Sequence, residues 1–264
     1  MANENQENQI STDSWSDVAL VVAHPAHAIM VSGIVQRFKP NILILGKSTA
    51  QESIVRHGLA LLGMQDKATF LGFEDSESYD RVLAGDFSFH IELGKQVSTW
   101  LSNVRPRVVL GDAFELSNFQ HDLGRALLDN ALRSYRSQFE YVQNYEFPIC
   151  CRAEEGTDKL FFQRFPFGEY ETFSLTAPEV EMKRTLGEWA SRHDDFIATV
   201  CPMIPDIQSE PYRSVPWNRN YTVPPSGLKK HYDDRGREEV KAGRYAKPIL
   251  FDDHFVPLVR ALGL

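Results

Sequence analysis

Two histidines lie close together near the start of the chain, in the stretch DVALVVAHPAHAIMVSG. A continuous apolar run ends at His24, and His27 follows after Pro25 and Ala26. A third histidine, His121, lies in the stretch GDAFELSNFQHDLGRALLDNAL. Neutral imidazole is a common ligand of zinc and iron, so three histidines that meet at one place predict a metal site with a position left open for water.

Polar residues around His121 add a second kind of chemistry. They are Asp112, Glu115, Asn118 and Asp122. A carboxylate beside a bound metal can act as a general base. A simpler interpretation stays open, because a histidine at a strand end is more often a capping or hydrogen-bonding residue, and this polar cluster also suits a solvated loop and the start of a helix.

The elements that must position these residues alternate along the first half of the chain. Apolar runs predict four strands covered on both faces, at residues 17–24, 41–46, 68–73 and 107–112. Helical spacing predicts helices between them, and Asn118 is the expected N-cap of a helix that carries His121 and Asp122 in its first turn. This order predicts an α/β fold with a Rossmann-like, mostly parallel sheet. Ligands gather at the carboxyl ends of such strands, where His24 and Asp112 are expected.

The second half of the chain has a different pattern. Three extended pieces are expected between residues 140 and 176, and the capping box TAPE at 176–179 predicts a long helix that reaches Val200. Residues 201–228 are rich in proline and aromatic side chains, which favours an ordered flap or substrate wall. We therefore expect a disordered lead-in at residues 1–16, one α/β domain at 17–200, and an irregular C-terminal extension at 201–264 packed on the same domain.

Composition excludes several classes of protein. The chain has 264 residues, 42% of them hydrophobic, and a formal net charge of −8, which argues against a dedicated nucleic-acid binder. Its apolar runs are too short to span a bilayer, and its first residues do not resemble a signal peptide. The three cysteines form neither a disulfide framework nor a zinc spacing, so we expect reduced thiols in a cytoplasmic protein.

The stretch VVAHPAHAIMVSG, followed by NFQHDLGRALLDNA, resembles the PIG-L/LmbE family of zinc-dependent deacetylases. The first signature of that family is A-H-P-D-D-E after the first strand, and the second is H-x-x-H at the start of a helix. The resemblance covers residues 17–135 by motif and residues 136–200 by general layout. It implies that His24 and His121 are metal ligands and that His27 stands where the family has a ligating aspartate. The implied cofactor is zinc, with iron or another divalent metal as alternatives.

Two departures from the family pattern affect the expected chemistry. Ala26 stands at the position of the general-base aspartate, so the usual base is missing. Asn118 replaces the first histidine of H-x-x-H, and its amide would face the oxyanion without shuttling a proton. Glu115 or Asp122 would then supply the base, with Glu115 favoured for its longer reach.

The chain also resembles a bacterial branch of the superfamily in which the motifs read H-P-x-H and D-A-x-E-x-x-N-x-x-H-D. The C-terminal stretches LKKHYDDRGREEVKAGRY and DDHF resemble that branch as well. Asp112, His231 and His254 thereby become candidate substrate-binding residues, and Glu239 a further candidate. Proteins of the branch are associated with glycan or secondary-metabolite biosynthesis.

Three functions remain open on the sequence. The first is a metal-dependent hydrolase, most plausibly an N-deacetylase that acts on an N-acylated amino sugar or a related small metabolite, with metal-bound water as nucleophile. The second is a divergent member that binds a metabolite without turnover, or that uses the three-histidine metal for lyase or redox chemistry. The third is a scaffold. The expected partner is a small-molecule or sugar substrate, without nucleic acid or membrane, and homo-oligomerisation is left open.

Overall fold

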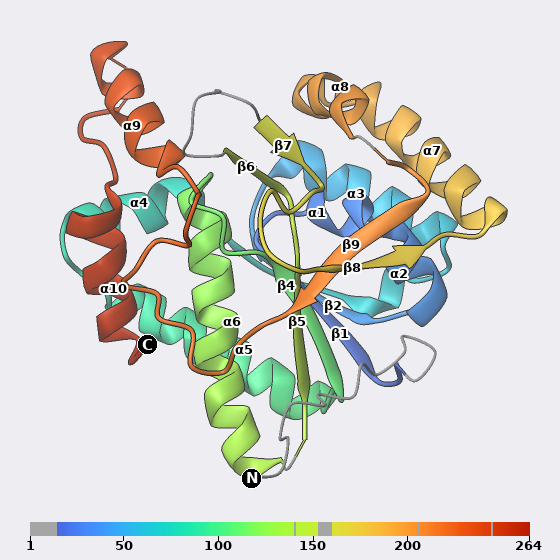
Figure 1. Cartoon of the computed structure of the whole chain (residues 1–264), viewed down its shortest axis with the longest axis horizontal. Helices are drawn as coiled ribbons and strands as arrows, with labels where there is room; N and C mark the ends of the chain where they lie inside the picture. The colour runs from blue at the N-terminus through green and yellow to red at the C-terminus, as the bar shows by residue number, and fades with distance from the viewer. Residues whose placement is uncertain (1–14, 140, 153–159, 205, 244) are drawn as a thin grey trace, which may run out of the picture.

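A seven-stranded sheet with helices on both faces forms the centre of the protein (Figure 1). A computed structural model describes residues 15–139, 141–152, 160–204, 206–243 and 245–264. The strands of the main sheet are β1 (Val18–Val22), β2 (Asn41–Gly46), β3 (Ala68–Phe73), β4 (Val108–Asp112), β5 (Gln143–Phe147), β8 (Glu171–Ser174) and β9 (Ser209–Ser214). Their spatial order is β3-β2-β1-β4-β5-β9-β8. The predicted α/β fold with a mostly parallel sheet is confirmed.

Five neighbouring strands are parallel, from β3 to β5, and the pairs β5–β9 and β9–β8 are antiparallel. The pairing of β1 with β4 sets Val21 opposite Gly111. The carboxyl ends of these two strands therefore lie side by side, and the residues that follow β1 meet Asp112. A separate hairpin consists of β6 (Cys150–Arg152) and β7 (Leu160–Phe162).

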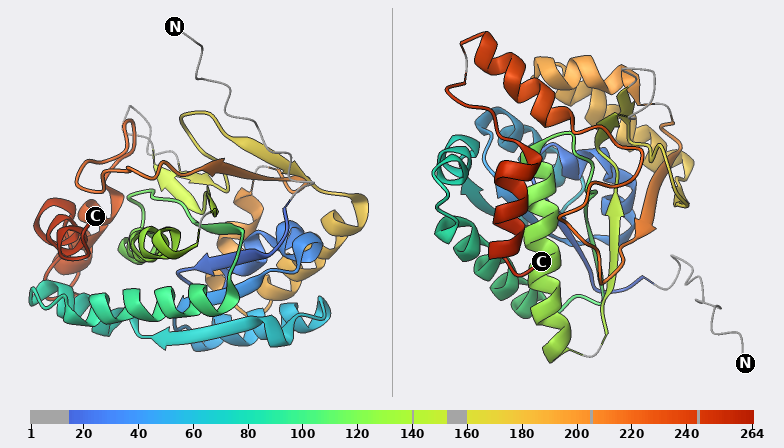
Figure 2. Two further views of the ribbon diagram at one scale, coloured as in Figure 1. Left: turned by 90° about the horizontal axis from the view of Figure 1, so that it is seen from below. Right: turned by 60° about the vertical axis from the view of Figure 1, so that its left-hand side comes forward.

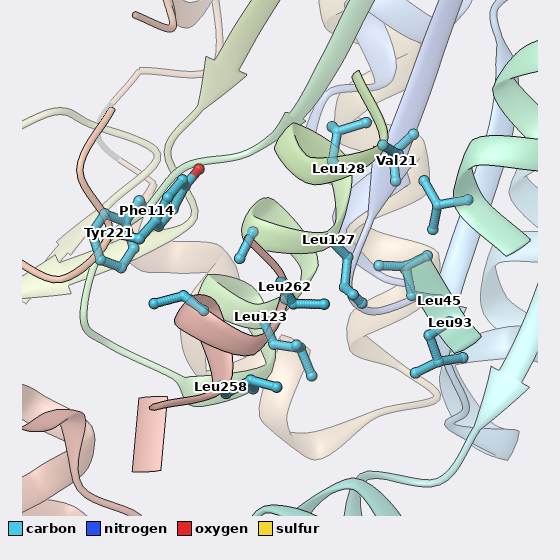
Figure 3. Packing of buried hydrophobic residues seen from close by; sticks show 14 of the residues in the cluster. Val21, Leu45, Leu93, Phe114, Leu123, Leu127, Leu128, Tyr221, Leu258 and Leu262 are labelled. Atoms are coloured by element: carbon cyan, nitrogen blue, oxygen red, sulfur yellow. The ribbon is translucent and has the colours of Figure 1, made fainter. Parts of the chain in front are cut away.

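Helices cover the two faces of the sheet separately (Figures 1 and 2). One face packs against α5 (Ser88–Val104), α6 (Phe119–Gln138) and the C-terminal η4 (Phe251–Phe255) and α10 (Val256–Ala261). Figure 3 shows part of this cluster, with Val21 and Leu45 of the strands near Leu127 of α6. The other face packs against α1 (His27–Met30), α2 (Ser32–Phe38) and α3 (Thr49–Leu61). Because both faces are covered, strands β1, β2 and β4 are apolar along almost their whole length.

The remaining helices are short or lie toward the edges of the sheet. They are η2 (Gln65–Lys67), α4 (Asp75–Leu83), α7 (Ala177–Ser191), α8 (Asp195–Val200), η3 (Cys201–Met203) and α9 (His231–Lys241). The predicted capping box of Thr176 and Glu179 is present at the start of α7. The long helix predicted to reach Val200 is instead two helices, because Asp194 caps α8 by accepting a hydrogen bond from the amide of Ile197. None of the helices among the described residues is long and apolar enough to cross a bilayer.

Two expectations about the ends of the chain need revision. Most of the predicted lead-in, residues 1–14, lies outside the described residues, but Trp15 is buried against Phe38, Tyr145 and Tyr212. Residues 201–228 also contain β9, which enters the main sheet between β5 and β8. The three cysteines carry free thiols, as expected.

A buried carboxylate joins the C-terminal segment to the sheet. Glu146 of β5 is fully buried and accepts hydrogen bonds from Arg213 Nε at 2.7 Å and from both terminal nitrogens of Arg219 at 2.6 and 2.8 Å. Burial alone would raise the pKa of Glu146, but Arg219, Arg213 and Arg125 outweigh it and lower this pKa to about 2. The carboxylate is therefore ionised at neutral pH and holds both arginines of the segment.

Replacing Glu146 by glutamine should destabilise the protein, because two partly buried arginines lose their counter-charge. We expect the free energy of unfolding to fall by about 3 kcal/mol or more in urea denaturation. The matched control is Glu92→Gln, which removes an exposed partner of Lys95 and should cost under about 0.5 kcal/mol. Equal effects of the two substitutions would contradict this assignment.

Candidate metal centre

Three histidines from two segments of the chain form one cluster. His24 follows β1, His27 is the first residue of α1, and His121 lies in the first turn of α6. Their ring centroids are 4.5 to 5.3 Å apart, and one potential ligand atom from each lies within 4.8 Å of the others. The sequence correctly predicted that these side chains come together, and their binding of a metal stays a prediction.

Local backbone structure explains how the cluster forms. After β1 the chain turns at once, with the amide of His27 donating to the carbonyl of His24 at 3.2 Å. On the other side, Asn118 is the N-cap of α6 and accepts a hydrogen bond from the amide of Gln120 at 2.9 Å, as predicted. The cap fixes the start of α6, so that His121 projects toward the turn after β1.

Two aspartates orient the histidine rings. Asp112 Oδ2 accepts from the amide of Ala23 at 2.7 Å and lies 2.9 Å from His27 Nδ1. Asp75 Oδ2, at the start of α4, lies 3.1 Å from His24 Nε2. When these ring nitrogens donate, His27 Nε2 and His24 Nδ1 remain as the ligand atoms. Carboxylates commonly hold metal-binding histidines in this way.

The cluster fits a divalent metal ion. Burial and the neighbouring His27 and His24 lower the pKa of His121 well below its usual value, so its ring is neutral. The Nδ1 atom of His121 is buried and has no hydrogen-bond partner among the described residues. Three imidazoles, two of them held by carboxylates, make a donor set suited to zinc with a position left open.

The histidines open into a cavity of about 1090 Å³. All three line it, together with Ala26, Asp75 and other residues from the hairpin, α7, α8 and α9. Such a volume is in the upper range of small-molecule sites. Ala26 thus leaves the cavity without a carboxylate at the position where the resemblance expects the base.

The two carboxylates expected to replace that base point elsewhere. Glu115 accepts hydrogen bonds from the amides of Ile149 and Cys150, both at 3.0 Å, and Asp122 accepts from the amides of Glu115 and Leu116. Burial raises the pKa of Glu115 well above its usual value and that of Asp122 to about 8. Neither lines the cavity. Because their oxygens hold backbone amides, the assignment of Glu115 or Asp122 as base stays a prediction that this geometry does not support.

The other candidates divide in the same way. Asn118 and His231 line the cavity, as the predicted roles of Asn118 at the oxyanion and of His231 in substrate binding require. Asp112 does not line it and acts through His27 instead. His254 also lies away from the cavity, where its Nδ1 accepts a hydrogen bond from the amide of Leu250 at 2.9 Å. Neither Asp112 nor His254 therefore lines this cavity, and their contact with substrate stays a prediction that this geometry does not support.

The sequence interpretation overlooked Asp75. This residue follows β3 closely, in the way that His24 follows β1 and Asp112 ends β4. The strand-end rule that selected those residues applies equally to β3 and was the available signal.

No protein-family model matches the chain, and no curated protein matches it. Solved structures with a similar fold include a deacetylase of teicoplanin biosynthesis, at 10% identity and a TM-score of 0.48 over 75% of this chain and 98% of that one. The A40926 pseudoaglycone deacetylase Dbv21 is similar at 10% identity and a TM-score of 0.47, over 77% and 98% of the two chains. The conserved protein TT1542 from Thermus thermophilus is 18% identical, with a TM-score of 0.46 over 78% of this chain and all of that one. At these values the activity of this chain has to be argued from its own side chains.

The different roles of Asp112 and Glu115 can be separated by paired substitutions. Asp112→Asn removes the charge behind His27, so we expect zinc affinity to fall by roughly 10- to 100-fold in a competition titration with a chromophoric chelator. Glu115→Gln is the matched control, a buried carboxylate in the loop that follows Asp112, which contacts no histidine in the hydrogen bonds described. It should lower the free energy of unfolding but leave zinc affinity unchanged. A larger loss of affinity in Glu115→Gln would reverse the assignment.

Proposed function

We propose that the protein is a metal-dependent hydrolase, an N-deacetylase that acts on an N-acylated amino sugar or a related small metabolite. The observation that carries the proposal is the three-histidine cluster, in which His27 and His121 are buried and His24 partly so; it has carboxylates behind two of its rings and opens into a large cavity. His24, His27 and His121 would hold the ion. A bound divalent ion would supply Lewis-acid activation of water and of the scissile carbonyl.

Asn118 is suited to stabilise the charge that develops on the carbonyl oxygen. Its Oδ1 is engaged by the amide of Gln120, so its Nδ2 remains a donor in the cavity wall. A donor held by a helix cap is preorganised, which is what oxyanion stabilisation requires.

Asp75 takes the role of proton acceptor in this proposal. Among the described residues that line the cavity, only Asp75 and Glu188 are acidic, and only Asp75 contacts one of the three histidines. Its carboxylate would accept a proton from the attacking water and return it to the nitrogen as the C–N bond breaks. The products are a free carboxylate and a free amine.

A second candidate function is metabolite binding without turnover. The observation that favours it is the orientation of Glu115 and Asp122 away from the cavity, together with Ala26 at the expected position of the base. Release of acetate from a panel of N-acetylated amino sugars separates the two functions. Binding without any acetate release would support the second.

Metal content tests the centre itself. Protein purified without an affinity tag should contain close to one equivalent of zinc or another divalent metal by elemental analysis, and His27→Ala should lose it. Removal of the ion by a chelator should lower the melting temperature of the wild type, because the ion binds only the folded state. His193→Ala, on an exposed histidine outside the cluster, is the control and should keep its metal. A wild type that stays metal-free after incubation with zinc would rule out this centre.

Substitution of Asp75 tests the proton acceptor. Asp75→Asn keeps an oxygen that can accept from His24, so zinc in excess should still fill the centre even if its affinity falls as expected for Asp112→Asn, whereas the rate of acetate release should fall by about 100- to 10,000-fold. Glu188→Gln alters the other acidic side chain of the cavity wall, which is exposed on α7, and should retain the wild-type rate. If Asp75→Asn loses its metal or keeps its activity, Asp75 is not the base.

A further inference from the structure

The cavity wall is basic although the protein is acidic. The chain has a formal net charge of −8. In contrast, the described residues that line the cavity include only two acidic ones, Asp75 and Glu188. The basic ones are Lys47, Arg152, Lys183, Arg184, Arg192 and Arg235. A cleft lined by one sign of charge concentrates ligands of the opposite sign.

Several of these cations are neutralised by carboxylates of the protein. Lys183 is buried and lies 2.8 Å from Glu210, and Lys47 lies 2.9 Å from Glu74. Arg184 pairs with Glu181 on the surface of α7. These three lysine and arginine side chains therefore have structural or surface partners within the protein.

Arg152, His231 and Arg235 form a basic group at the α9 end of the cavity. His231 and Arg235 are four residues apart on α9, so they share one helix face. The carbonyl of Arg152 accepts from the amide of Lys229 at 3.0 Å, which brings the end of β6 beside the start of α9. The contact between Arg235 and Glu239 is long, at 4.0 Å. Within the part of the chain that the structure describes, Arg235 thus keeps most of its hydrogen-bonding capacity.

The basic group is tied to the loop that carries the candidate oxyanion donor. The amide of His231 donates to the carbonyl of Leu116 at 2.9 Å, two residues before Asn118. Burial, and then Arg152, Arg235 and Lys229, lower the pKa of His231, with Asp234 acting in the opposite direction. A ligand whose amide faces the histidine cluster would therefore have this group within the same cavity.

We propose that Arg152, His231 and Arg235 form a subsite for a phosphate or carboxylate group of the substrate. The inference rests on the proposed function, because it assigns the amide to the histidine cluster and the anion to the α9 end. Guanidinium groups bind both oxyanions through paired hydrogen bonds. The substrate class then narrows to anionic N-acyl amino sugars and related acidic metabolites.

Binding to the metal-loaded, full-length protein tests the subsite by calorimetry at constant ionic strength. The probes are N-acetylglucosamine 6-phosphate, N-acetylmuramic acid, neutral N-acetylglucosamine and inorganic phosphate. We expect at least one anionic sugar to bind 10-fold or more tightly than the neutral one, and the phosphate and carboxylate arms show which oxyanion is preferred. Arg235→Gln should reduce this preference to less than threefold. The control is Arg237→Gln on the same helix, which lies outside this cavity and should keep the preference.

Phosphate could also bind to the metal ion. The variant His27→Ala, which should lose the ion, separates this binding from binding by the arginines. The subsite predicts that inorganic phosphate still binds this variant and that adding Arg235→Gln removes it. The proposal is overturned if no probe binds, if the anionic and neutral sugars bind equally, or if Arg235→Gln and Arg237→Gln behave alike. Anion binding without acetate release would instead remove the proposed hydrolase and leave the subsite standing.

Discussion

The candidate site depends on a single buried carboxylate, that of Asp112. It sits at the end of β4 and binds both the amide that follows β1 and the ring of His27. The parallel pairing of β1 with β4 brings these groups together, because Val21 lies opposite Gly111 and the segments that follow the two strands leave the sheet side by side. Donors stabilise a buried carboxylate, and here both act on Oδ2, so that single oxygen fixes the turn through the amide of Ala23 and the ring of His27.

The same requirement governs the loop between β4 and α6. Leu116 has a left-handed backbone with φ of 57°, which is unfavourable for a leucine. Asp122 accepts from the amides of Glu115 and Leu116, and Glu115 in turn accepts from two amides at the start of the β6 hairpin. These carboxylates therefore hold the loop in the shape that presents Asn118 and His121. Their contacts position other groups, and neither carboxyl group lines the cavity.

The sequence could not predict which carboxylates hold the backbone and which line the cavity. Apolar runs predicted β1 to β4, and the strand-end position of His24 and the cap at Asn118 predicted the cluster, because backbone pattern determines which residues reach one edge of a sheet. The pattern does not reveal the direction of a side chain. Glu115 and Asp75 are both carboxylates near strand ends, yet only Asp75 lines the cavity. Strand β9 was missed for a related reason, since its proline and charged residues lack an apolar period and it enters the sheet through pairing with β5 and β8.

The C-terminal segment also helps to hold the loop between β4 and α6 in place. Arg213 and Arg219 satisfy Glu146, whose Oε2 also accepts from the amide of Phe114 in the loop after β4. The first turn of α9 binds the carbonyl of Leu116, two residues farther along that loop. The loop is therefore held from the sheet on one side and from the segment on the other. Since one loop supports the oxyanion donor, a histidine of the cluster and the start of α9, the shape of the cavity and the basic character of its wall are set by the same buried contacts.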